Sequence, residues 1–436
     1  MTGDVDPDSL AAAIAPPALA AATAPPWRHL DDLRITGVRS IVTAPEGLPL
    51  VVVRVDTSDA GLYGLGCATF TQRFSAVTTV VDEFVAALVR GRHPADIDDI
   101  TRMVHHSSYW RAGPVLNNAL SGLDMALWDI AGKRAGLPAH DLLGGRVRAA
   151  APTYLHAGGV DIAATLAHAE RIMADGWQHV RLQTGQPGAG AYGSPPAPTR
   201  YVDRPNPDGW DVRHYLRETP RLFSLARERL GEEVELLHDT HSRLSPKDAI
   251  ILARSLEPYR LFFLEDVVAP EHYDRLPEVR ASSSTPLAVG ELLASVPDAV
   301  RLVLSGSIDY LRLHLSAVGG LTPARKLTAL CELVGVRTAW HAPADVSPVG
   351  AAANLALDVS SAAFGIQEGH LYNDAALEVF PGAPQPRRGY LKPSQAPGLG
   401  VDLDERAAAK HPPLRTFGHD RWAAQVRSDD GGLLAP

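Results

Sequence analysis

The sequence predicts an α/β protein in which a (β/α)8 TIM barrel follows an N-terminal α+β domain. Three short apolar runs end in the carboxylates Asp239, Glu265 and Glu291, and 26 residues separate each acid from the next. Such an interval fits one strand, one covering helix and two loops, so the three acids should lie at equivalent ends of successive parallel strands. Further apolar runs ending in polar residues continue this pattern to Glu368. The pattern is typical of the C-terminal mouth of a barrel.

Composition narrows the classes of function. The chain has 436 residues, of which 45% are hydrophobic and 21% charged, as in ordinary globular proteins. The net charge of −9 and the lack of a basic run argue against nucleic acid as a partner. Cys67 and Cys331 are the two cysteines, which favours the reducing cytoplasm. No run approaches the roughly 20 apolar residues of a membrane span, so we expect no membrane partner.

The first third of the chain contains two predicted units. Residues 1–30 are rich in Ala and Pro and carry early aspartates, which are the wrong charge for a signal peptide, so we expect a disordered extension. Residues 31–148 should form the α+β domain. The β-branched run 50–55 predicts a strand, and helical patterning follows from 75 to 89. Leucines from Leu116 to Leu127, and then Ile130, recur at steps of three and four, which predicts a further helix.

The barrel is expected over residues 149–380. Its first strand should cover 152–156, a helix 162–173, and its second strand 179–183. The next interval is long, because the Gly/Pro-rich loop 185–210, which contains Tyr192, lies between Arg181 and Asp239. A loop of that size leaving a barrel mouth is usually functional or disordered. Residues 381–436 should form a C-terminal segment that packs back on the N-terminal domain.

The three carboxylates indicate a metal site. Converging acids raise each other's pKa, and a hard divalent cation relieves this repulsion. Ligation by oxygen alone favours Mg²⁺ over zinc, so Asp239, Glu265 and Glu291 are the candidate ligands. Each acid taken singly could equally be a helix N-cap or a loop carboxylate. Their common spacing makes that explanation unlikely for all three together.

Several basic and aromatic residues near these acids are candidates for catalysis. His241 lies two residues after Asp239, so in an extended strand end both side chains would face the mouth, and His241 becomes a proton-transfer candidate. His341 receives the same interpretation more weakly, and His238 should face away and pack in the core. Arg181 and Arg312 could be surface cations. At strand ends they more plausibly balance an anionic substrate or lower a neighbour's pKa.

The chain resembles a known family through six sequence blocks. They are Gly122-Leu-Asp-Met-Ala-Leu-Trp-Asp-Ile, Leu142-Leu-Gly-Gly, Asp239-Thr-His241, Leu264-Glu-Asp, Val289-Gly-Glu291 and Trp340-His-Ala-Pro-Ala-Asp-Val-Ser-Pro-Val. These blocks resemble the enolase superfamily and, within it, the D-mannonate dehydratase family, over residues 33–425. The resemblance implies an N-terminal capping domain over a modified barrel. It also implies Mg²⁺ and the dehydration of an acid sugar, D-mannonate or D-gluconate, to 2-keto-3-deoxy-D-gluconate.

The resemblance also implies individual roles. Tyr192, paired with Arg181, would be the base that removes the C2 proton, and His241 would be the general acid. The positions expected to bind substrate are His156, Arg312, His341, Asp345 and Glu368. Besides the acid sugar, we expect a second copy of the chain as a partner, in a cytoplasmic homo-oligomer. The chemistry agrees, because a metal that neutralises the substrate carboxylate stabilises the charge formed when C2 loses a proton.

The sequence also departs from the family pattern. The loop after Tyr192 is Pro-rich, Pro49 stands where relatives tend to have Asn, and the tail lacks the family's common Trp. Pro343 resembles the less efficient members, some of which take D-gluconate. Two alternatives therefore stay open: an enolase-type dehydratase acting on another acid sugar, and a catalytically impaired metal-binding relative with a regulatory role.

Overall fold

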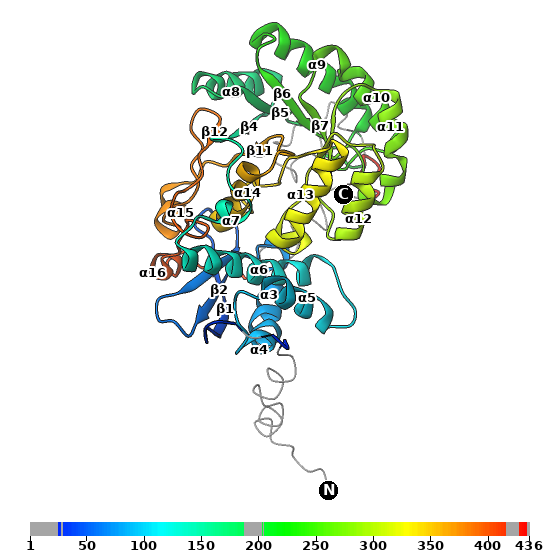
Figure 1. Ribbon diagram of the computed structural model, residues 1–436. Coiled ribbons are helices and arrows are strands. Elements are labelled where there is room, and N and C mark those ends of the chain that lie inside the picture. The colour runs from blue at the N-terminus through cyan, green and yellow to red at the C-terminus, as the bar shows by residue number, and fades with distance from the viewer. Residues whose placement is uncertain (1–24, 28, 187–202, 204, 416–426, 434–436) are drawn as a thin grey trace.

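The computed structural model describes residues 25–27, 29–186, 203, 205–415 and 427–433. Figure 1 shows the N-terminal domain, in blue and cyan, beside a green and yellow barrel. The orange C-terminal segment runs along both. Among the described residues, no helix combines the length and the apolar character needed to cross a membrane.

The N-terminal domain packs helices on a three-stranded antiparallel sheet of order β1-β2-β3. β-branched residues dominate β2, which suits a strand buried on both faces, and Val51, Val52 and Val53 are fully buried. The predicted helix 75–89 is present as α3, a π-helical segment and α4. The elements are β1 (Ile35–Thr43), β2 (Leu50–Thr57), β3 (Tyr63–Cys67), α3 (Phe74–Thr79), α4 (Ala86–Val89), α5 (Ile97–Ser107), α6 (Pro114–Ala135) and α7 (Ala139–Leu142).

The barrel contains eight parallel strands, β4 to β11, in sequence order around the wall. A bridge between Thr338 and Phe364 and the pairing of β11 with β4 close it. The predicted fold class is therefore confirmed. The strands are β4 (Ala151–Gly159), β5 (His179–Thr184), β6 (Glu235–Asp239), β7 (Phe263–Glu265), β8 (Leu287–Val289), β9 (Tyr310–Leu311), β10 (Arg337–Thr338) and β11 (Gln367–Glu368).

Helices join consecutive strands on the outside of the barrel (Figure 1). They are α8 (Ile162–Ala174), α9 (Val212–Leu230), α10 (Pro246–Leu256), α11 (Leu276–Ser282), α12 (Val296–Leu304), α13 (Leu321–Val334) and α14 (Pro348–Ser360). Side chains from the strands and from residues next to them form a separate apolar cluster: Tyr154, Leu237, Phe263, Ala288, Ala339 and Ile366. The barrel is thus a packed core that leaves polar chemistry to its ends.

Helix α6 connects the N-terminal domain to the barrel. Gly64 and Gly66 of β3 let the helix approach closely, since a Cβ at either position would lie 2.0 Å from a carbonyl oxygen of α6. At the start of α6, the Asn117 amide donates to the carbonyls of Ala294 and Ala317 in the barrel loops. This helix therefore fixes the domain beside the carboxyl ends of β8 and β9.

The C-terminal segment, which contains α15 (Asp374–Val379), β12 (Tyr390–Leu391) and α16 (Glu405–Ala408), contacts both domains. Glu405 accepts from Arg39 and Arg54 of the N-terminal domain. Residues 427–433 instead contact the barrel connection 206–210. At the other terminus, Trp27 and His29 contact Asp96, so part of the expected extension packs on the domain. Residues 1–24 lie outside the described residues.

Candidate active site

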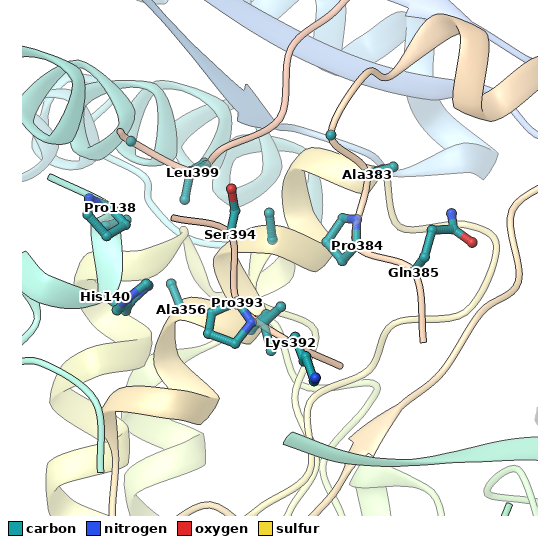
Figure 2. A pocket seen from close by; sticks show the side chains of 15 residues that line it. Pro138, His140, Ala356, Ala383, Pro384, Gln385, Lys392, Pro393, Ser394 and Leu399 are labelled. Carbon is teal, nitrogen blue, oxygen red and sulfur yellow. The ribbon is translucent and has the colours of Figure 1, made fainter. Parts of the chain in front are cut away.

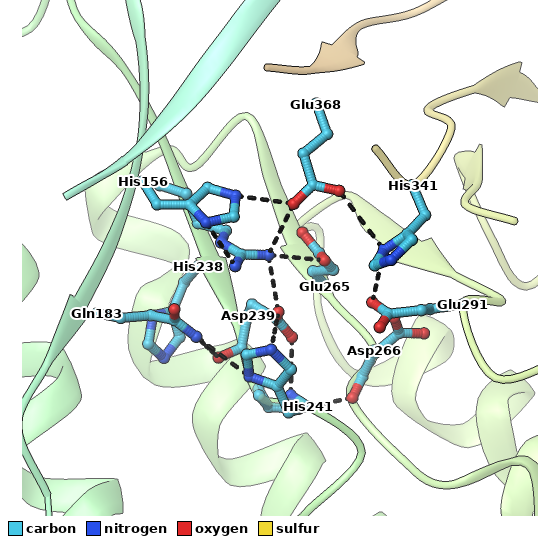
Figure 3. Close-up of polar contacts among 12 residues, drawn as sticks. His156, Gln183, His238, Asp239, His241, Glu265, Asp266, Glu291, His341 and Glu368 are labelled. Carbon is cyan, nitrogen blue, oxygen red and sulfur yellow. Dashed lines mark hydrogen bonds and ion pairs between the residues drawn. The ribbon is translucent and has the colours of Figure 1, made fainter. Parts of the chain in front are cut away.

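The mouth of the barrel gathers the polar residues that follow the strands. The parallel register places His156 of β4 opposite Arg181 of β5, and Asp239 of β6 opposite Glu265 of β7. Glu291 after β8, His341 after β10 and Glu368 of β11 complete the group of side chains labelled in Figure 3. Strand ends that the sequence places at equal intervals therefore do meet at one edge of the sheet.

Arg181 organises one half of the mouth. Its Nη1 donates to Asp239 Oδ2 at 2.8 Å and to Glu265 Oε1 at 3.0 Å, and its Nη2 lies 3.1 Å from His156 Nδ1. His156 in turn lies 2.8 Å from Glu368 Oε1 through its Nε2. The Nε of Arg181 is buried and has no hydrogen-bond partner among the described residues. One donor of this guanidinium therefore remains available to a further group.

Arg312 organises the other half. This guanidinium, 1% exposed, contacts Glu265 Oε1 at 2.5 Å, Glu368 Oε2 at 2.6 Å and Glu291 Oε2 at 3.3 Å. His341 lies 3.0 Å from Arg312 Nη1, 3.5 Å from Glu291 and 3.1 Å from Asp345. Glu265 thus joins the two halves, because both arginines contact its Oε1.

The two halves hold their histidines in different charge states. Desolvation within the mouth, with the nearby Arg181 charge, lowers the pKa of His156 to about 4. Burial also opposes protonation of His341, but Glu291 and Asp345 outweigh it and raise the pKa of His341 well above its ordinary value. Near neutral pH, His156 is a neutral imidazole and His341 a cation. The Arg312 half therefore carries the additional positive charge.

The pKa values of the acids are also shifted in opposite directions. Burial raises the pKa of Glu265 well above its ordinary value, and the arginines offset only part of this. Burial would raise the pKa of Asp239 too, but His241 and Arg181 outweigh it and keep that pKa below its ordinary range. The same competition, with His341 and Arg312 as the cations, lowers the pKa of Glu291 to about 2.

His241 reaches Asp239 by a route that the sequence did not predict. The expectation of an extended strand end is wrong, because His241 and Ser242 have φ of 48° and 59°, in the left-handed region. The turn brings His241 Nε2 to 2.9 Å from Asp239 Oδ2, and the His241 amide donates to Asp239 Oδ1 at 2.7 Å. Left-handed backbone outside glycine costs energy and persists where the surroundings impose it, commonly at functional sites.

Two further residues belong to the mouth, although sequence reasoning assigned them no role. Gln183 of β5 places its Nε2 3.2 Å from His241 Nδ1, and so orients that ring. Asp266, with φ of 42°, accepts from the Gly290 amide at 2.9 Å and braces the loop that carries Glu291. The alternation of side chains along β5, which puts Gln183 on the same face as Arg181, was the one signal available for the first.

The remaining predicted residues are placed as follows. His238 is buried and packs away from the mouth, as expected. Tyr192 lies outside the described residues. Side-chain exposure divides the others into a floor and a rim. Asp239, Glu265, Arg312 and Glu368 are at most 1% exposed, and Arg181 is 5% exposed. The rim consists of His156 at 34%, Asp345 at 33%, Glu291 at 23% and His241 at 17%.

The acids at the mouth suit a divalent cation. Oxygens of Glu265, Asp266 and Glu291 lie within 4.8 Å of one another, and Glu265 Oε2 is buried with no hydrogen-bond partner among the described residues. A bare buried carboxylate oxygen is costly unless a cation or donor meets it. Asp239 is outside this group, and its Oδ2 contacts Arg181 and His241. The donor set is all oxygen, which Mg²⁺ prefers.

A second cavity does not compete with this site. It has a volume of about 150 Å³ and lies between α7, α14 and the C-terminal segment (Figure 2). His140 and Lys392 are its titratable lining residues, and none of its lining residues belongs to the barrel strands β4 to β11. Figure 2 shows that the side chains of Gln385 and Lys392 do not point toward one another. The cavity thus lacks the converging groups that the barrel mouth has.

Comparisons with known proteins agree with the fold. Residues 33–144 match the mandelate racemase / muconate lactonizing enzyme N-terminal domain, and residues 164–407 match the enolase C-terminal domain-like family. A D-galactonate dehydratase family member from Catenulispora acidiphila is 67% identical, over 94% of this chain and 95% of the relative. Another from Pantoea ananatis is 47% identical, over 93% and 100%.

A solved structure is similar as well. The crystal structure of an enolase from Pantoea ananatis, with bound D-gluconate and Mg, has a TM-score of 0.87 and 47% identity, covering 93% of this chain and 100% of that one. The resemblance to the enolase superfamily is therefore confirmed, while the relatives carry the name D-galactonate rather than D-mannonate dehydratase family. The chain belongs to the enolase superfamily and, within it, to the D-galactonate dehydratase family.

Proposed function

We propose that this enzyme is a Mg²⁺-dependent hydro-lyase that converts D-gluconate, D-mannonate or both into 2-keto-3-deoxy-D-gluconate. The observation that carries the proposal is the buried set of carboxylates at the mouth, in which Glu265 Oε2 has no partner among the described residues. The D-gluconate and Mg in the similar Pantoea ananatis enolase support both the cofactor and the substrate class.

The metal ligands that we propose are Asp239, Glu265 and Glu291. Asp266 is near enough to compete, but its Oδ1 already accepts from Gly290, and its carbonyl accepts from the Ser242 amide at 2.7 Å. It therefore braces two loops. Mg²⁺ would supply positive charge against the substrate carboxylate while C2 loses its proton. Asp239 can exchange its contact with Arg181 or His241 for that charge.

The rim and the floor have different proposed roles. His156 and Asp345 border the open part of the mouth, and His341 lies 3.1 Å from Asp345, so these three residues would contact the hydroxyl and carboxylate groups of the acid sugar. Arg312 and Glu368 are 1% exposed, and we propose that they act on substrate through the acids and histidines that they hold. This arrangement leaves a cationic His341 on the side that would receive an anionic ligand.

Proton transfer is assigned to two residues. Tyr192 would remove the C2 proton, and the Arg181 Nε–H, which has no partner among the described residues, is a donor that would stabilise its phenolate. His241 would protonate the departing 3-hydroxyl, since Gln183 and Asp239 fix its ring at the rim. Tyr192→Phe keeps the ring but removes the ionisable oxygen. We expect it to stop both dehydration and exchange of the C2 hydrogen in D₂O, and undiminished dehydration would move the role of base to His241.

A panel of acid sugars tests the proposal as a whole. The protein is incubated with Mg²⁺ and each sugar, and the 2-keto acid product is quantified. We expect product from D-gluconate, D-mannonate or both, and none in excess chelator. Because residues 431–436 contain no Trp and the 185–210 loop is Pro-rich, we expect the two C2 epimers to differ in rate by less than about a thousandfold. Lack of turnover of every sugar tested, or full activity in chelator, would reject it.

A further inference from the structure

The C-terminal residues 427–433 form a small hairpin on the barrel. The Ser428 amide donates to the Gly432 carbonyl at 2.9 Å, and a bridge joins Arg427 to Leu433. Arg427, Asp430, Gly432 and Leu433 are exposed, and Leu433 leaves 63% of its surface in water. This hairpin buries little apolar surface, so it contributes little to the stability of the barrel.

The hairpin holds one barrel connection by its backbone. The Trp210 amide donates to the Arg427 carbonyl at 2.7 Å, and the Asn206 amide donates to the Asp429 carbonyl at 2.9 Å. The Asn206 side chain adds a hydrogen bond to the Ser428 carbonyl at 3.0 Å. Gly209 makes this approach possible, because a Cβ there would lie 2.4 Å from the Ser428 carbonyl oxygen. The hairpin therefore contributes only backbone carbonyls to these hydrogen bonds, and the close approach requires the glycine at position 209.

Trp210 connects the segment held by the hairpin to residues near the active site. Its ring, 6% exposed, packs on Tyr215 with centroids 4.9 Å apart, and Arg243 lies over it at 4.9 Å. The Tyr215 hydroxyl is 2.7 Å from His238 Nε2, and His238 Nδ1 is 2.8 Å from the Leu182 carbonyl. A carbonyl only accepts, so Nδ1 carries the proton of a neutral ring and Tyr215 donates to Nε2.

This chain of contacts ends at the strand that carries the chemistry. His238 precedes Asp239 on β6, and Arg243 lies two residues after His241. A cavity of about 20 Å³ is lined by Trp210, Tyr215 and His238 together with Asp239 and His241. Packed groups around so small a space cannot move independently. The position of Trp210 therefore constrains the end of β6.

We propose that the hairpin 427–433 is a positioning element of the active site, which acts through Trp210, Tyr215 and His238 on the end of β6. The inference rests on the proposed dehydratase function, because its effect is read as turnover. Misplacing a reacting group by about 1 Å can cost a hundredfold in rate, so loss of the anchor should lower kcat by at least about tenfold. The KM for D-gluconate should change by less than about threefold, since His156 and Asp345, on other elements of the mouth, stay in place.

Two variants remove the anchor in different ways. One ends the chain after residue 426, and the other is Gly209→Ala, whose methyl group would collide with Ser428. Gly37→Ala is the matched control, because a Cβ there meets nothing closer than 3.8 Å. We measure kcat and KM, the melting temperature, and hydrogen exchange of the peptide that contains Asn206 and Trp210.

The expected result has three parts. In both variants the Asn206 and Trp210 amides exchange faster, kcat falls with KM nearly constant, and the melting temperature stays within a few degrees of the wild-type value. Gly37→Ala changes none of them. Faster exchange with unchanged kcat would overturn the inference. So would a large fall in melting temperature accompanied by a fall in kcat and a comparable rise in KM. If the wild-type chain turns over no acid sugar, the proposed function fails instead.

Discussion

Glu265 at the barrel mouth and Asp129 on helix α6 are both buried carboxylates, but their surroundings differ. At the mouth, Glu265 is fully buried, its Oε1 contacts two arginines, and its Oε2 has no partner among the described residues. On α6, Asp129 is equally buried, yet both oxygens accept: from the Leu65 and Leu399 amides and from Lys133. Glu265 therefore has an oxygen that can bind a ligand, whereas Asp129 joins three segments of the fold.

This difference separates function from architecture. A buried acid whose oxygens are all satisfied by backbone amides contributes to folding, and its loss leaves those amides unpaired. A buried acid with a bare oxygen is a cost to the folded chain that a bound cation can offset. Substitutions in the two regions should therefore separate activity from stability, and the following predictions are designed to break or sharpen that separation.

The largest effect is expected from Glu265→Gln. The amide keeps the shape but removes the charge that we assign to the metal, so turnover should fall by about a thousandfold or more. Stability should change little, because burial already disfavours the charged form of Glu265. Turnover of D-gluconate and denaturant unfolding measure the two quantities. A variant with wild-type turnover would remove Glu265 from the mechanism.

His241→Asn should lower the dehydration rate by about a hundredfold to ten-thousandfold, the usual contribution of a general acid. The base would remain, so some exchange of the C2 hydrogen should survive. Incubation in D₂O, followed by NMR at C2, distinguishes the two steps. Loss of exchange in parallel with dehydration would show that His241 acts on the C2 proton itself. The same experiment on Tyr192→Phe provides the comparison.

Asp129→Ala should show the opposite behaviour. It leaves Lys133 and the amides of Leu65 and Leu399 without their acceptor, so we expect the chain to lose about 3 kcal/mol of unfolding free energy. At a temperature where the variant is folded, kcat should stay within about twofold of wild type. A fall in kcat as large as that of Glu265→Gln would contradict the architectural role of α6.

Asp124, also on α6, gives a smaller effect that depends on pH. Burial raises its pKa from 3.8 to about 7, and hydrogen bonds from the Thr322 region oppose only part of this shift. The folded chain therefore binds this proton more tightly than the unfolded chain, and stability falls as pH rises from about 4 to 7. Asp124→Asn does not titrate, so relative to wild type it should gain up to about 3 kcal/mol across that window, since each unit of pKa shift is worth about 1.4 kcal/mol. Denaturant unfolding at pH 4.5 and 7.5 measures the gain, and an equal difference at both values would contradict the shift.

The sequence predicts most of the architecture, because strand ends and helix stripes are local patterns. The equal spacing of Asp239, Glu265 and Glu291 correctly places all three at one mouth, and the leucine stripe correctly predicts α6. Contacts between distant segments could not be predicted in this way. The left-handed turn at His241, the amide bonds to Asp129 and the docking of Ser428 on Gly209 depend on tertiary packing, which leaves no periodic signal.

Mg²⁺ titration calorimetry tests the central claim most directly, because it needs no knowledge of the substrate. Wild type, Glu265→Gln and Asp129→Asn are titrated under the same conditions, with Asp129→Asn as the matched loss of a buried acid. We predict one Mg²⁺ bound per chain in wild type and in Asp129→Asn, and binding weakened by at least about tenfold in Glu265→Gln. Equal Mg²⁺ affinity in wild type and Glu265→Gln would contradict the assignment of the barrel mouth as the metal site.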